Sequence, residues 1–401
     1  MSDVAASGEC AGRRCFDQLG RLVMFRESEV VMSDKTAQPV RFAVVGIGHF
    51  AQGAILPAFA NAKEEAKLAA LVTGDAKKAA ELGKKYEVPA FGYDAYDRLC
   101  ASGDIDAVYI ALPNSQHREY TERAARAKVH VLCEKPLAYT AADAQAMIDA
   151  CRAADVRLMT AYRLHFEAGN LQAIEAAHSG RIGEPRLFQA LHTMQVAADN
   201  IRVDRELGGG PLEDIGIYCI NAARYLFRAE PTEVTAHAAW STDARFHEVP
   251  ESVSALLRFP DDRLAQFMCG FGEAKATQYR LLGTKGMLEM NPAFTWNDAI
   301  KQTIETADED AERVFHHRDQ VAAELVHFAE CVREGKEPEP SGREGWIDVR
   351  IIEALRTSYD EDRPVKLEPL PKDSRPSAKQ SIRRDPPKQP ETVNAAPPAK
   401  G

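Results

Sequence analysis

Short apolar segments alternate with helix-forming segments from residue 40 to residue 161. The apolar segments are 40–45, 68–72, 90–91, 107–112, 129–133 and 157–161, and the helices are expected after residue 51 up to about 66 and at 76–86, 116–127 and 140–154. This alternation predicts an α/β fold with a Rossmann-type, doubly wound parallel sheet. Because ligands bind at the carboxyl ends of such strands, the residues that follow each segment are the functional candidates.

The first apolar segment runs into Gly46-Ile47-Gly48-His49-Phe50-Ala51, the G-x-G-x-x-A form of the dinucleotide fingerprint. Gly46 permits the tight turn, Gly48 lets a pyrophosphate approach the backbone, and Ala51 lets the helix pack closely. Any strand–turn–helix unit also tolerates glycines, so the motif gains weight from the strand before it and the helix after it. We assign Gly46, Gly48, His49, Phe50 and Ala51 to a cofactor site.

The second apolar segment ends in Thr73-Gly74-Asp75, with Lys77 and Lys78 just beyond. An NAD site usually has an acid at this strand end to bind the ribose hydroxyls. Thr73 is neutral, and cations follow it, which suits a 2′-phosphate and favours NADP over NAD. The alternative is that Lys77 and Lys78 form a solvated helix face.

Proline ends two further strands at the same edge. Leu112-Pro113-Asn114 follows one strand, and Cys133-Glu134-Lys135-Pro136 follows the next. Pro136 has no N–H and disfavours helix at Lys135, so the chain must turn there and present Lys135 at the ligand edge. The alternative is a surface Glu–Lys pair. Asn114 is expected to cap the following helix, and His117 to stack on or cap it rather than act as a base.

After residue 161 the pattern changes to an α+β domain with an open, mostly antiparallel sheet. Strands are expected at 187–194, 232–239, 252–259, 263–269 and 277–283, and helices at 167–179, 319–334 and 344–360. We expect a disordered or mis-annotated arm at 1–38, a dinucleotide-binding domain at 39–161, a substrate and oligomerisation domain at 162–366, and a disordered Pro/Lys-rich tail at 367–401. An open sheet face often pairs with its own copy, so a homodimer or homotetramer is expected.

The segment 208–221 begins with three glycines and Pro211 and then reads as a helix. Asp214 and Tyr218 are four residues apart and share one helical face, with Asn221 nearby. The glycines suggest a flexible approach to a helix that has proline in its first turn. The alternative is a helix whose polar face is simply hydrated.

Together, Gly46-x-Gly48, Ala111-Leu112-Pro113-Asn114 with His117, Cys133-Glu134-Lys135-Pro136, Ala161-Tyr162-Arg163, and Gly208-Gly209-Gly210 with Asp214 and Tyr218 resemble the Gfo/Idh/MocA oxidoreductase family. The resemblance spans about 40–366 and is closest to the glucose–fructose oxidoreductase branch, which has tyrosine where many relatives have histidine. Val72-Thr73-Gly74 with Lys78 also resembles that branch's NADP-binding turn.

The resemblance implies a role for each matching residue. Tyr218 would be the acid/base for a sugar hydroxyl, assisted by Lys135, since a free tyrosine has a pKa of about 10 and a nearby ammonium favours its phenolate. Asp214 would orient the substrate or Lys135, and Arg163 and Arg202 would line the sugar site. The cofactor side would comprise Thr73, Gly74, Lys78, Leu112, Pro113, Asn114, His117, Glu134, Lys135 and Arg163.

Composition excludes several other classes. The 401 residues carry a formal net charge of −10, which disfavours nucleic acid as a partner, and no stretch is long and apolar enough to span a membrane. Eight scattered cysteines without a C-x-x-C pair favour a reducing cytoplasm and no metal site. Arg13-Arg14 is a poor twin-arginine signal because charged residues interrupt the apolar run after it.

An NADP-dependent sugar oxidoreductase is therefore the leading interpretation. The alternatives are an anhydro-sugar or other keto-sugar reductase, a one-substrate dehydrogenase, and a non-catalytic NADP- or sugar-sensing protein. A sensor needs no acid/base pair, so Lys135, Asp214 and Tyr218 argue against it.

Overall fold

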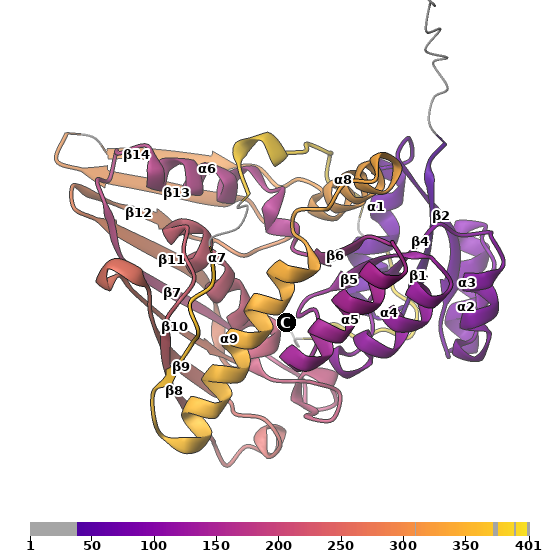
Figure 1. The fold of residues 1–401 in the computed structure, drawn as a ribbon, viewed down its shortest axis with the longest axis horizontal. Coiled ribbons are helices and arrows are strands. Elements are labelled where there is room, and N and C mark those ends of the chain that lie inside the picture. Colours follow the sequence, from indigo (N-terminus) through magenta and orange to yellow (C-terminus); the bar gives the residue numbers. More distant parts are fainter. Residues whose placement is uncertain (1–37, 309, 372–375, 389, 399–401) are drawn as a thin grey trace, which may run out of the picture. The chain divides into compact units, whose positions relative to one another are not determined.

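The computed structural model describes residues 38–308, 310–371, 376–388 and 390–398 (Figure 1). The first sheet is parallel and has the strand order β3-β2-β1-β4-β5-β6, as expected for a Rossmann fold. Its strands are β1 (Val40–Val45), β2 (Ala66–Val72), β3 (Ala90–Phe91), β4 (Ala107–Ile110), β5 (His130–Glu134) and β6 (Leu158–Ala161). Its helices are α1 (Leu56–Asn61), α2 (Ala76–Tyr86), α3 (Tyr96–Ala101), α4 (His117–Arg126) and α5 (Ala141–Ala153).

Both faces of this sheet are buried, as its continuous apolar strands require. In β1, Phe42 and Val44 point into one core, which α1 completes, whereas Ala43 and Val45 point into another, which α3, α4 and α5 complete. The first helix is shorter than predicted. A π-helical turn at Ala51–Ile55 precedes α1, and Ala66 is already paired with Val40 in the sheet.

The second sheet is mostly antiparallel, with the strand order β14-β13-β12-β11-β7-β10-β9-β8-β15. Its strands are β7 (Pro185–Gln195), β8 (Glu233–Ala239), β9 (Ser252–Arg258), β10 (Leu264–Gly270), β11 (Gly272–Gly283), β12 (Gly286–Met290), β13 (Ile300–Thr306), β14 (Asp310–Phe315) and β15 (Val365–Lys366). Sequence reasoning missed β12, β13 and β14. The edge strand β14 is charged and has no fully buried residue, so its apolar pattern is weak.

Among the residues that the structure describes, helices cover only one face of the second sheet. These are α6 (Ala168–His178), α7 (Ile217–Phe227) and α9 (Gly342–Glu361); in Figure 1 α6 lies beside β13 and β14, and α9 lies between the two sheets. Along β9 and β10 buried and exposed residues alternate, so the far face of this sheet is uncovered in the described structure.

One predicted element belongs elsewhere. Helix α8 (Gln320–Glu334), expected within the second domain, packs on the first sheet instead. Phe328 lies 6.1 Å from Phe42 between ring centroids, and Leu325 is fully buried in the same core. The chain therefore returns to the first domain after building the second, which a single boundary at residue 161 does not describe.

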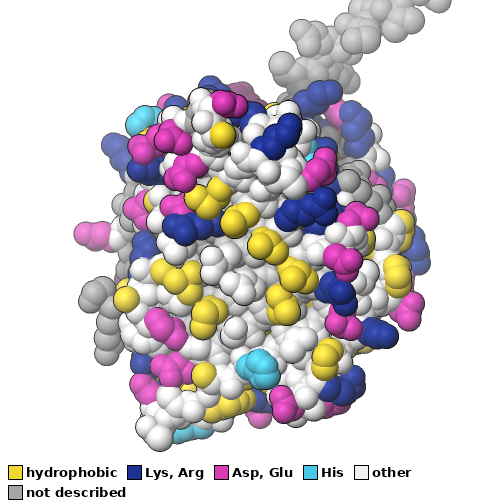
Figure 2. All heavy atoms as spheres, turned by 90° about the vertical axis from the view of Figure 1, so that its left-hand side faces the viewer, with side chains coloured by type: hydrophobic (Ala, Val, Ile, Leu, Met, Phe, Trp, Pro, Cys, Tyr) yellow, Lys and Arg dark blue, Asp and Glu magenta, His cyan; other side chains and the backbone are white. Residues whose placement is uncertain are grey.

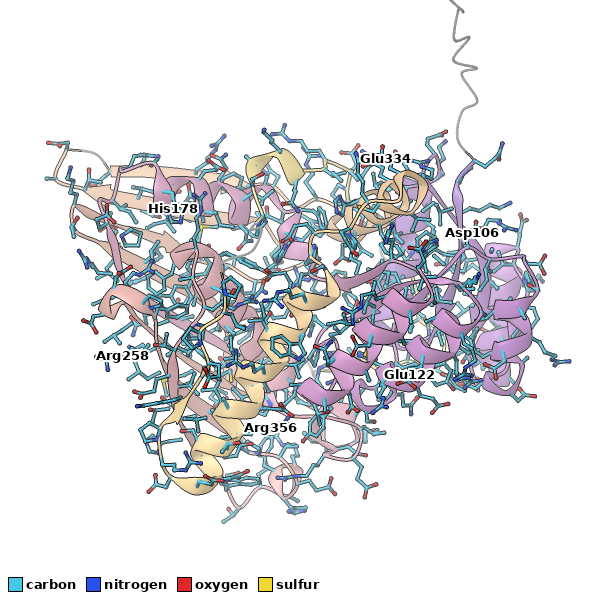
Figure 3. All side chains as sticks on the ribbon, viewed as in Figure 1. Asp106, Glu122, His178, Arg258, Glu334 and Arg356 are labelled. Carbon is cyan, nitrogen blue, oxygen red and sulfur yellow. The ribbon has the colours of Figure 1, made fainter. Side chains whose placement is uncertain are left out.

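Helix α9 connects the two sheets. Arg356, labelled in Figure 3, places its guanidinium 4.2 Å from the ring centroid of Tyr139, just after β5, and donates to the Tyr139 carbonyl at 2.8 Å. It also pairs with Glu213 at 3.4 Å, at the start of the α7 segment. One side chain thus ties the Lys135 turn to the helix that carries Tyr218.

The expected disordered tail differs from the structure. Residues 376–388 and 390–398 lie against both domains: Ile382 and Val393 pack on the core of the first, whereas Ala378 and Pro398 form hydrogen bonds to residues of the second. Low hydrophobicity predicted disorder, but the docking relies on a few hydrogen bonds and two apolar contacts that composition does not reveal. The arm predicted at 1–38 lies almost wholly outside the described residues.

Candidate active site

Lys135 lies at the end of β5 and reaches the second domain. Its Nζ donates to the main-chain oxygen of Asp214 at 2.7 Å and to the Oδ1 of Asp214 at 3.2 Å. Burial opposes the charged form, but Tyr218, Asp214 and Glu134 outweigh this, so the pKa of Lys135 is raised above its usual value. Lys135 is thus an ammonium held at the junction of the two domains.

Asp214 bridges two cations. Its other oxygen accepts from the Nε of Arg202 at 2.6 Å, and Arg202 is positioned by the short helical turn Ile201–Val203. Burial disfavours the carboxylate, but Arg202 and Lys135 together hold the pKa of Asp214 well below its usual range. The predicted group of Lys135, Asp214 and Arg202 is therefore contiguous.

Tyr218 lies between two cations as well. The Lys135 Nζ and the Arg163 Cζ are each 5.0 Å from the centroid of its ring. Phe294 stacks on the ring at 5.9 Å and His192 lies at 5.5 Å. Burial lowers the pKa of His192 to about 3, so this imidazole is neutral and adds no charge. Sequence reasoning missed His192 and Phe294, which no local motif marks.

The turn that presents Asp214 is π-helical. It spans Leu212–Gly216 and continues directly into α7. Such wider turns occur often at functional sites. Asn221 borders the same small hollow as Tyr218, as expected, and it donates to Asp348 at 2.7 Å in a buried network.

The three glycines serve close packing rather than flexibility. Gly208 has φ +82°, and a Cβ there would lie 2.8 Å from the Cβ of Asn114. At Gly209 a Cβ would meet the main-chain oxygen of Arg202 at 2.5 Å. Asn114 does not cap its helix; its Nδ2 donates to the Gly208 oxygen at 2.8 Å, while the neighbouring Ser115 N–H donates to Leu207. This loop fastens the two domains together beside the site.

His117 cannot contact a cofactor in this structure, contrary to its assignment. It is fully buried, with Nε2 2.9 Å from the Leu112 oxygen and Nδ1 3.0 Å from the Pro136 oxygen. Both contacts are to carbonyls at the ends of β4 and β5. His117 holds the two proline turns together from behind, a structural role that differs from the predicted stacking on or capping of its helix.

The fingerprint loop has the shape that a dinucleotide needs. Gly46 has φ +90°, and a Cβ would lie 2.5 Å from the Ala111 oxygen, so only glycine fits there. At Gly48 a Cβ would meet nothing within 4 Å, which leaves the backbone open to a phosphate. His49 has a buried Nδ1 without a hydrogen-bond partner among the described residues, and Phe50 packs edge-on against Trp296 at 5.9 Å.

The end of β2 matches the prediction of a neutral residue with cations beyond it. Thr73 is buried, and its hydroxyl accepts from the N–H of Asp75 at 3.2 Å. The Asp75 carboxylate caps α2 through the N–H groups of Lys77 and Lys78, at 2.9 and 3.1 Å. Asp75 therefore acts as a helix cap, and Gly74 and Lys78 remain accessible beside it.

Glu134 and Arg163 are more enclosed than expected. Glu134 accepts from the Tyr109 hydroxyl at 2.8 Å and from the N–H of Lys135 at 3.2 Å. Behind it, burial and the charge of Glu134 raise the pKa of Glu324 well above its usual value. Arg163 donates to the main-chain oxygens of Phe294 and Thr295, at 2.6 and 3.1 Å, and to Gln320. These donors fix Arg163 beside Tyr218 and are already engaged within the protein.

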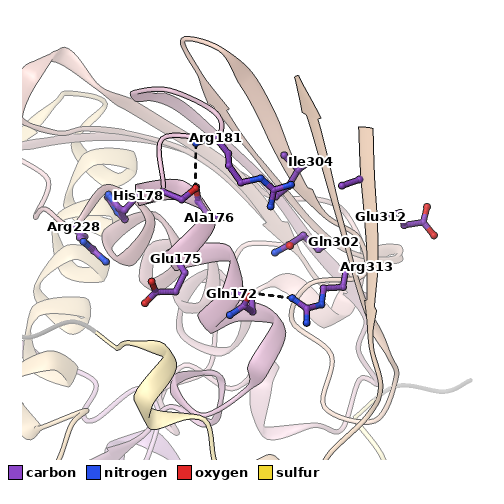
Figure 4. Close-up of a pocket in the computed structure, with 12 residues that line it drawn as sticks. Gln172, Glu175, Ala176, His178, Arg181, Arg228, Gln302, Ile304, Glu312 and Arg313 are labelled. Carbon is purple, nitrogen blue, oxygen red and sulfur yellow. Dashed lines mark hydrogen bonds between the residues drawn. The ribbon is translucent and has the colours of Figure 1, made fainter. Parts of the chain in front are cut away.

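A separate hollow of about 650 Å³ lies between α6 and the β13–β14 hairpin (Figure 4). Arg181, Arg228 and Arg313 line it together with Glu175 and Glu312. It contains none of the predicted site residues. Among the described residues there is no group of three or more His, Cys, Asp or Glu suited to a metal ion, and no helix long and apolar enough to cross a membrane.

Comparisons with known proteins agree with this architecture. Residues 40–162 match the oxidoreductase family with an NAD-binding Rossmann fold, and residues 170–289 match the GFO/IDH/MocA C-terminal domain. A D-xylose 1-dehydrogenase [NADP(+)] of Haloarcula marismortui is 33% identical over 343 residues, covering 83% of this chain and 94% of that protein.

Solved structures give the same result. An aldose-aldose oxidoreductase from Caulobacter crescentus, complexed with glycerol, superposes with a TM-score of 0.78 at 38% identity, covering 82% of this chain and 100% of that one. A 3-ketoreductase from Actinomadura kijaniata, in complex with NADP and TDP-benzene, superposes with a TM-score of 0.74 at 30% identity, covering 80% and 98%. On its sequence, its fold and these matches, the chain belongs to the Gfo/Idh/MocA family of oxidoreductases.

Proposed function

We propose that this protein is an NADP-dependent sugar oxidoreductase that interconverts a sugar CH–OH and the corresponding carbonyl. The observation that carries the proposal is the convergence of Lys135 from the first domain and Tyr218 from the second, with the Lys135 Nζ 5.0 Å from the Tyr218 ring. Side chains that faced separate cavities would have opposed it.

The chain's own residues supply the proton chemistry. Tyr218 takes the proton from the sugar hydroxyl during oxidation and returns it to the carbonyl oxygen during reduction. The Lys135 ammonium stabilises the negative charge on the phenol oxygen and can donate to the same sugar oxygen. Asp214 and Arg202 hold that ammonium in place through the 3.2 Å and 2.6 Å contacts at the carboxylate.

NADP, when bound, accepts or donates the hydride at its nicotinamide ring. Gly46, Gly48 and His49 would hold its pyrophosphate, and Thr73, Gly74 and Lys78 its 2′-phosphate. Leu112, Pro113 and Glu134 would border it at the strand ends, with Arg163 behind Tyr218. The relatives named for NADP support this choice over NAD.

The test is to measure turnover and NADP binding separately. Lys135→Ala and Tyr218→Phe should each lower kcat/KM by about 10²–10⁴-fold for the preferred sugar, while NADP still binds. Lys84→Ala and Tyr86→Phe, which change the same residue types at the far end of α2, should leave both values unchanged. Retained turnover in both site variants would refute the acid/base assignment.

The substrate can be identified by assaying a panel of sugars. Aldoses, keto-sugars and 1,5-anhydro-fructose, each assayed with NADP or NADPH by nicotinamide absorbance, would separate a dehydrogenase from a keto-sugar reductase. A two-sugar exchange of the glucose–fructose type is supported if the protein keeps its nucleotide through purification and turns over only when both sugars are added. Binding of NADP without turnover on any sugar would favour the sensor.

We also propose that the uncovered face of the second sheet binds a second copy of the chain. Leu187, Leu256, Met268 and Leu282 lie on this face, each more than a third exposed. Leu187 is in register with Leu264 and with Leu282, so the apolar side chains are adjacent across three strands. Figure 2 shows hydrophobic side chains gathered on this face, where a monomer rarely exposes a large apolar patch. Met268→Lys should shift the protein to monomers in light scattering.

The proposal of a cytoplasmic location is supported by the six cysteines in the described residues, which are all free and buried. Free thiols persist in reducing compartments. Fractionation of cells that express the full chain would test it.

A further inference from the structure

The C-terminal segment 390–398, which we call the strap, crosses the edge where the first sheet would hold its cofactor. The chain that leads to it is anchored on α1 and α8. Arg384 donates to the Asn61 oxygen at 3.0 Å and to Glu65 at 3.0 Å, and the Asp319 N–H donates to the Arg384 oxygen at 3.1 Å. Ile382 and Val393 pack on the first core.

The strap first meets the fingerprint helix. Gln52, which is 1% exposed, donates its Nε2 to the Val393 oxygen at 2.9 Å and accepts from the Val393 N–H at 2.7 Å. The same Nε2 lies 3.2 Å from the oxygen of Ile47, between the two fingerprint glycines. One buried side chain therefore joins the strap to the phosphate-binding loop.

The strap next reaches the ribose end of the site. The Asn394 Nδ2 donates to Asp75 Oδ2 at 3.2 Å. Asp75 directly follows Thr73 and Gly74 and caps α2, so Asn394 lies beside the position expected for the 2′-phosphate. The pKa of Asp75 is lowered by its bonds to the Lys78 N–H and to Asn394, which keeps the carboxylate ionised as an acceptor.

The strap ends on the other domain. The N–H of Ala197, two residues beyond the end of β7, donates to the Pro398 oxygen at 2.9 Å. Asn394 and Pro398 are four positions apart in the chain, a span of at most roughly 14 Å. The strap thus runs from the phosphate loop to the ribose end and then to the domain that carries Tyr218.

We propose that the strap is part of the cofactor site and retains the bound dinucleotide, so that NADP leaves only after Asn394 and Pro398 detach. This rests on the proposed function, because the strap would have nothing to retain without NADP. The bonds at Asp75 and Ala197 are few and partly exposed, so the strap can open without unfolding the core.

The test measures the dissociation rate of NADPH, displaced by excess NADP and followed by fluorescence, with no sugar present. A chain that ends at Asp385 keeps Ile382 and the Arg384 contacts but lacks the strap. It should release NADPH at least about tenfold faster, since several net hydrogen bonds are lost. A chain that ends at Pro398 is the matched control and should release it at the full-length rate.

A full-length variant keeps the proposal testable if the shortened chain does not fold. Asn394→Asp places a carboxylate beside Asp75 and should also speed release, by about threefold or more, whereas Lys388→Ala should not.

Equal NADPH release rates in all variants would refute the proposed role of the strap and leave the proposed function intact. Tighter NADPH binding without the strap would also overturn it, because the strap would then compete for the site. Failure of the full-length protein to bind NADP or NADPH would refute the proposed function itself.

Discussion

Two ionic clusters lie along α7 and the turn that precedes it, one around Arg224 in α7 and one around Asp214 in the turn. The two clusters differ in closure, by which we mean how completely their side chains are buried. Arg224, near the carboxyl end of α7, donates to Glu230 at 2.6 Å, to Asp348 at 2.7 Å and to Glu344 at 2.9 Å. All four side chains are at most 4% exposed. The cluster around Asp214 contains Lys135 and Arg202, and its side chains are 13–27% exposed.

Both clusters are built from ion pairs, but one stabilises the packing of helices and the other is the proposed catalytic site. Arg224 has its donors directed at carboxylates and has no route to a ligand, so it fixes α7 against α9 through Glu344 and Asp348. Lys135 is paired with Asp214 and also contacts the Tyr218 ring, and its side chain remains 13% exposed, as the proposed contact with a sugar requires. Closure, rather than residue type, separates the structural cluster from the proposed catalytic one.

Disrupting the fully buried cluster around Arg224 should have the largest effect on the free energy of unfolding. Arg224→Met removes one cation from three buried carboxylates, and we expect a loss of about 3–5 kcal/mol in the free energy of unfolding. Urea denaturation monitored by circular dichroism measures this. A loss below about 1 kcal/mol would show that these carboxylates bind protons at little cost, and the contrast between the clusters would fail.

Disrupting the cluster around Asp214 should lower the free energy of unfolding less than disrupting the cluster around Arg224, but it should lower activity more. Asp214→Asn keeps the shape but removes the charge that holds Lys135 and Arg202. We expect about 1–2 kcal/mol of lost stability, between the values for surface and buried pairs, and at least about tenfold lower kcat/KM.

The contribution of the Asp214 carboxylate to folding stability should depend on pH in a defined direction. The folded pKa of Asp214 is below the unfolded value of 3.8, so its contribution is fully present above that value and is lost as the pH falls through the folded pKa. The stability gap between wild type and Asp214→Asn should therefore be constant from about pH 5 to 8 and shrink in stronger acid. A gap that narrows between pH 5 and 8 would contradict an ionised Asp214 in a persistent ion pair.

An exposed ion pair should contribute the least to the free energy of unfolding. Arg152 and Asp149 on α5 are 2.7 Å apart, but their side chains are 77% and 49% exposed. Arg152→Ala should change the free energy of unfolding by about 0.5 kcal/mol or less and leave kcat/KM unchanged. A larger loss would show that contact distance, rather than closure, sets the strength of these pairs.

The Rossmann half was predictable in detail because its signals are local. The alternation of strands and helices predicted the parallel sheet, and Gly46 and Pro136 each mark a local backbone conformation, a positive φ at Gly46 and a turn at Pro136. In the second domain, Gly208 to Gly210 were visible but misinterpreted, because a glycine needed for close approach to Asn114 looks the same in sequence as a flexible one.

By itself, the sequence determined the class of fold, the turns at the strand ends and the residue types available for hydride-transfer chemistry. Only the tertiary structure decided that Lys135 meets Asp214 and Tyr218, that His117 lies behind the site, that α8 returns to the first sheet and that the C-terminal segment docks at Gln52 and Asp75. The reason is physical: a local pattern reports the conformation of neighbours in the chain, whereas these contacts join residues far apart in sequence, and their formation depends on packing of the whole molecule.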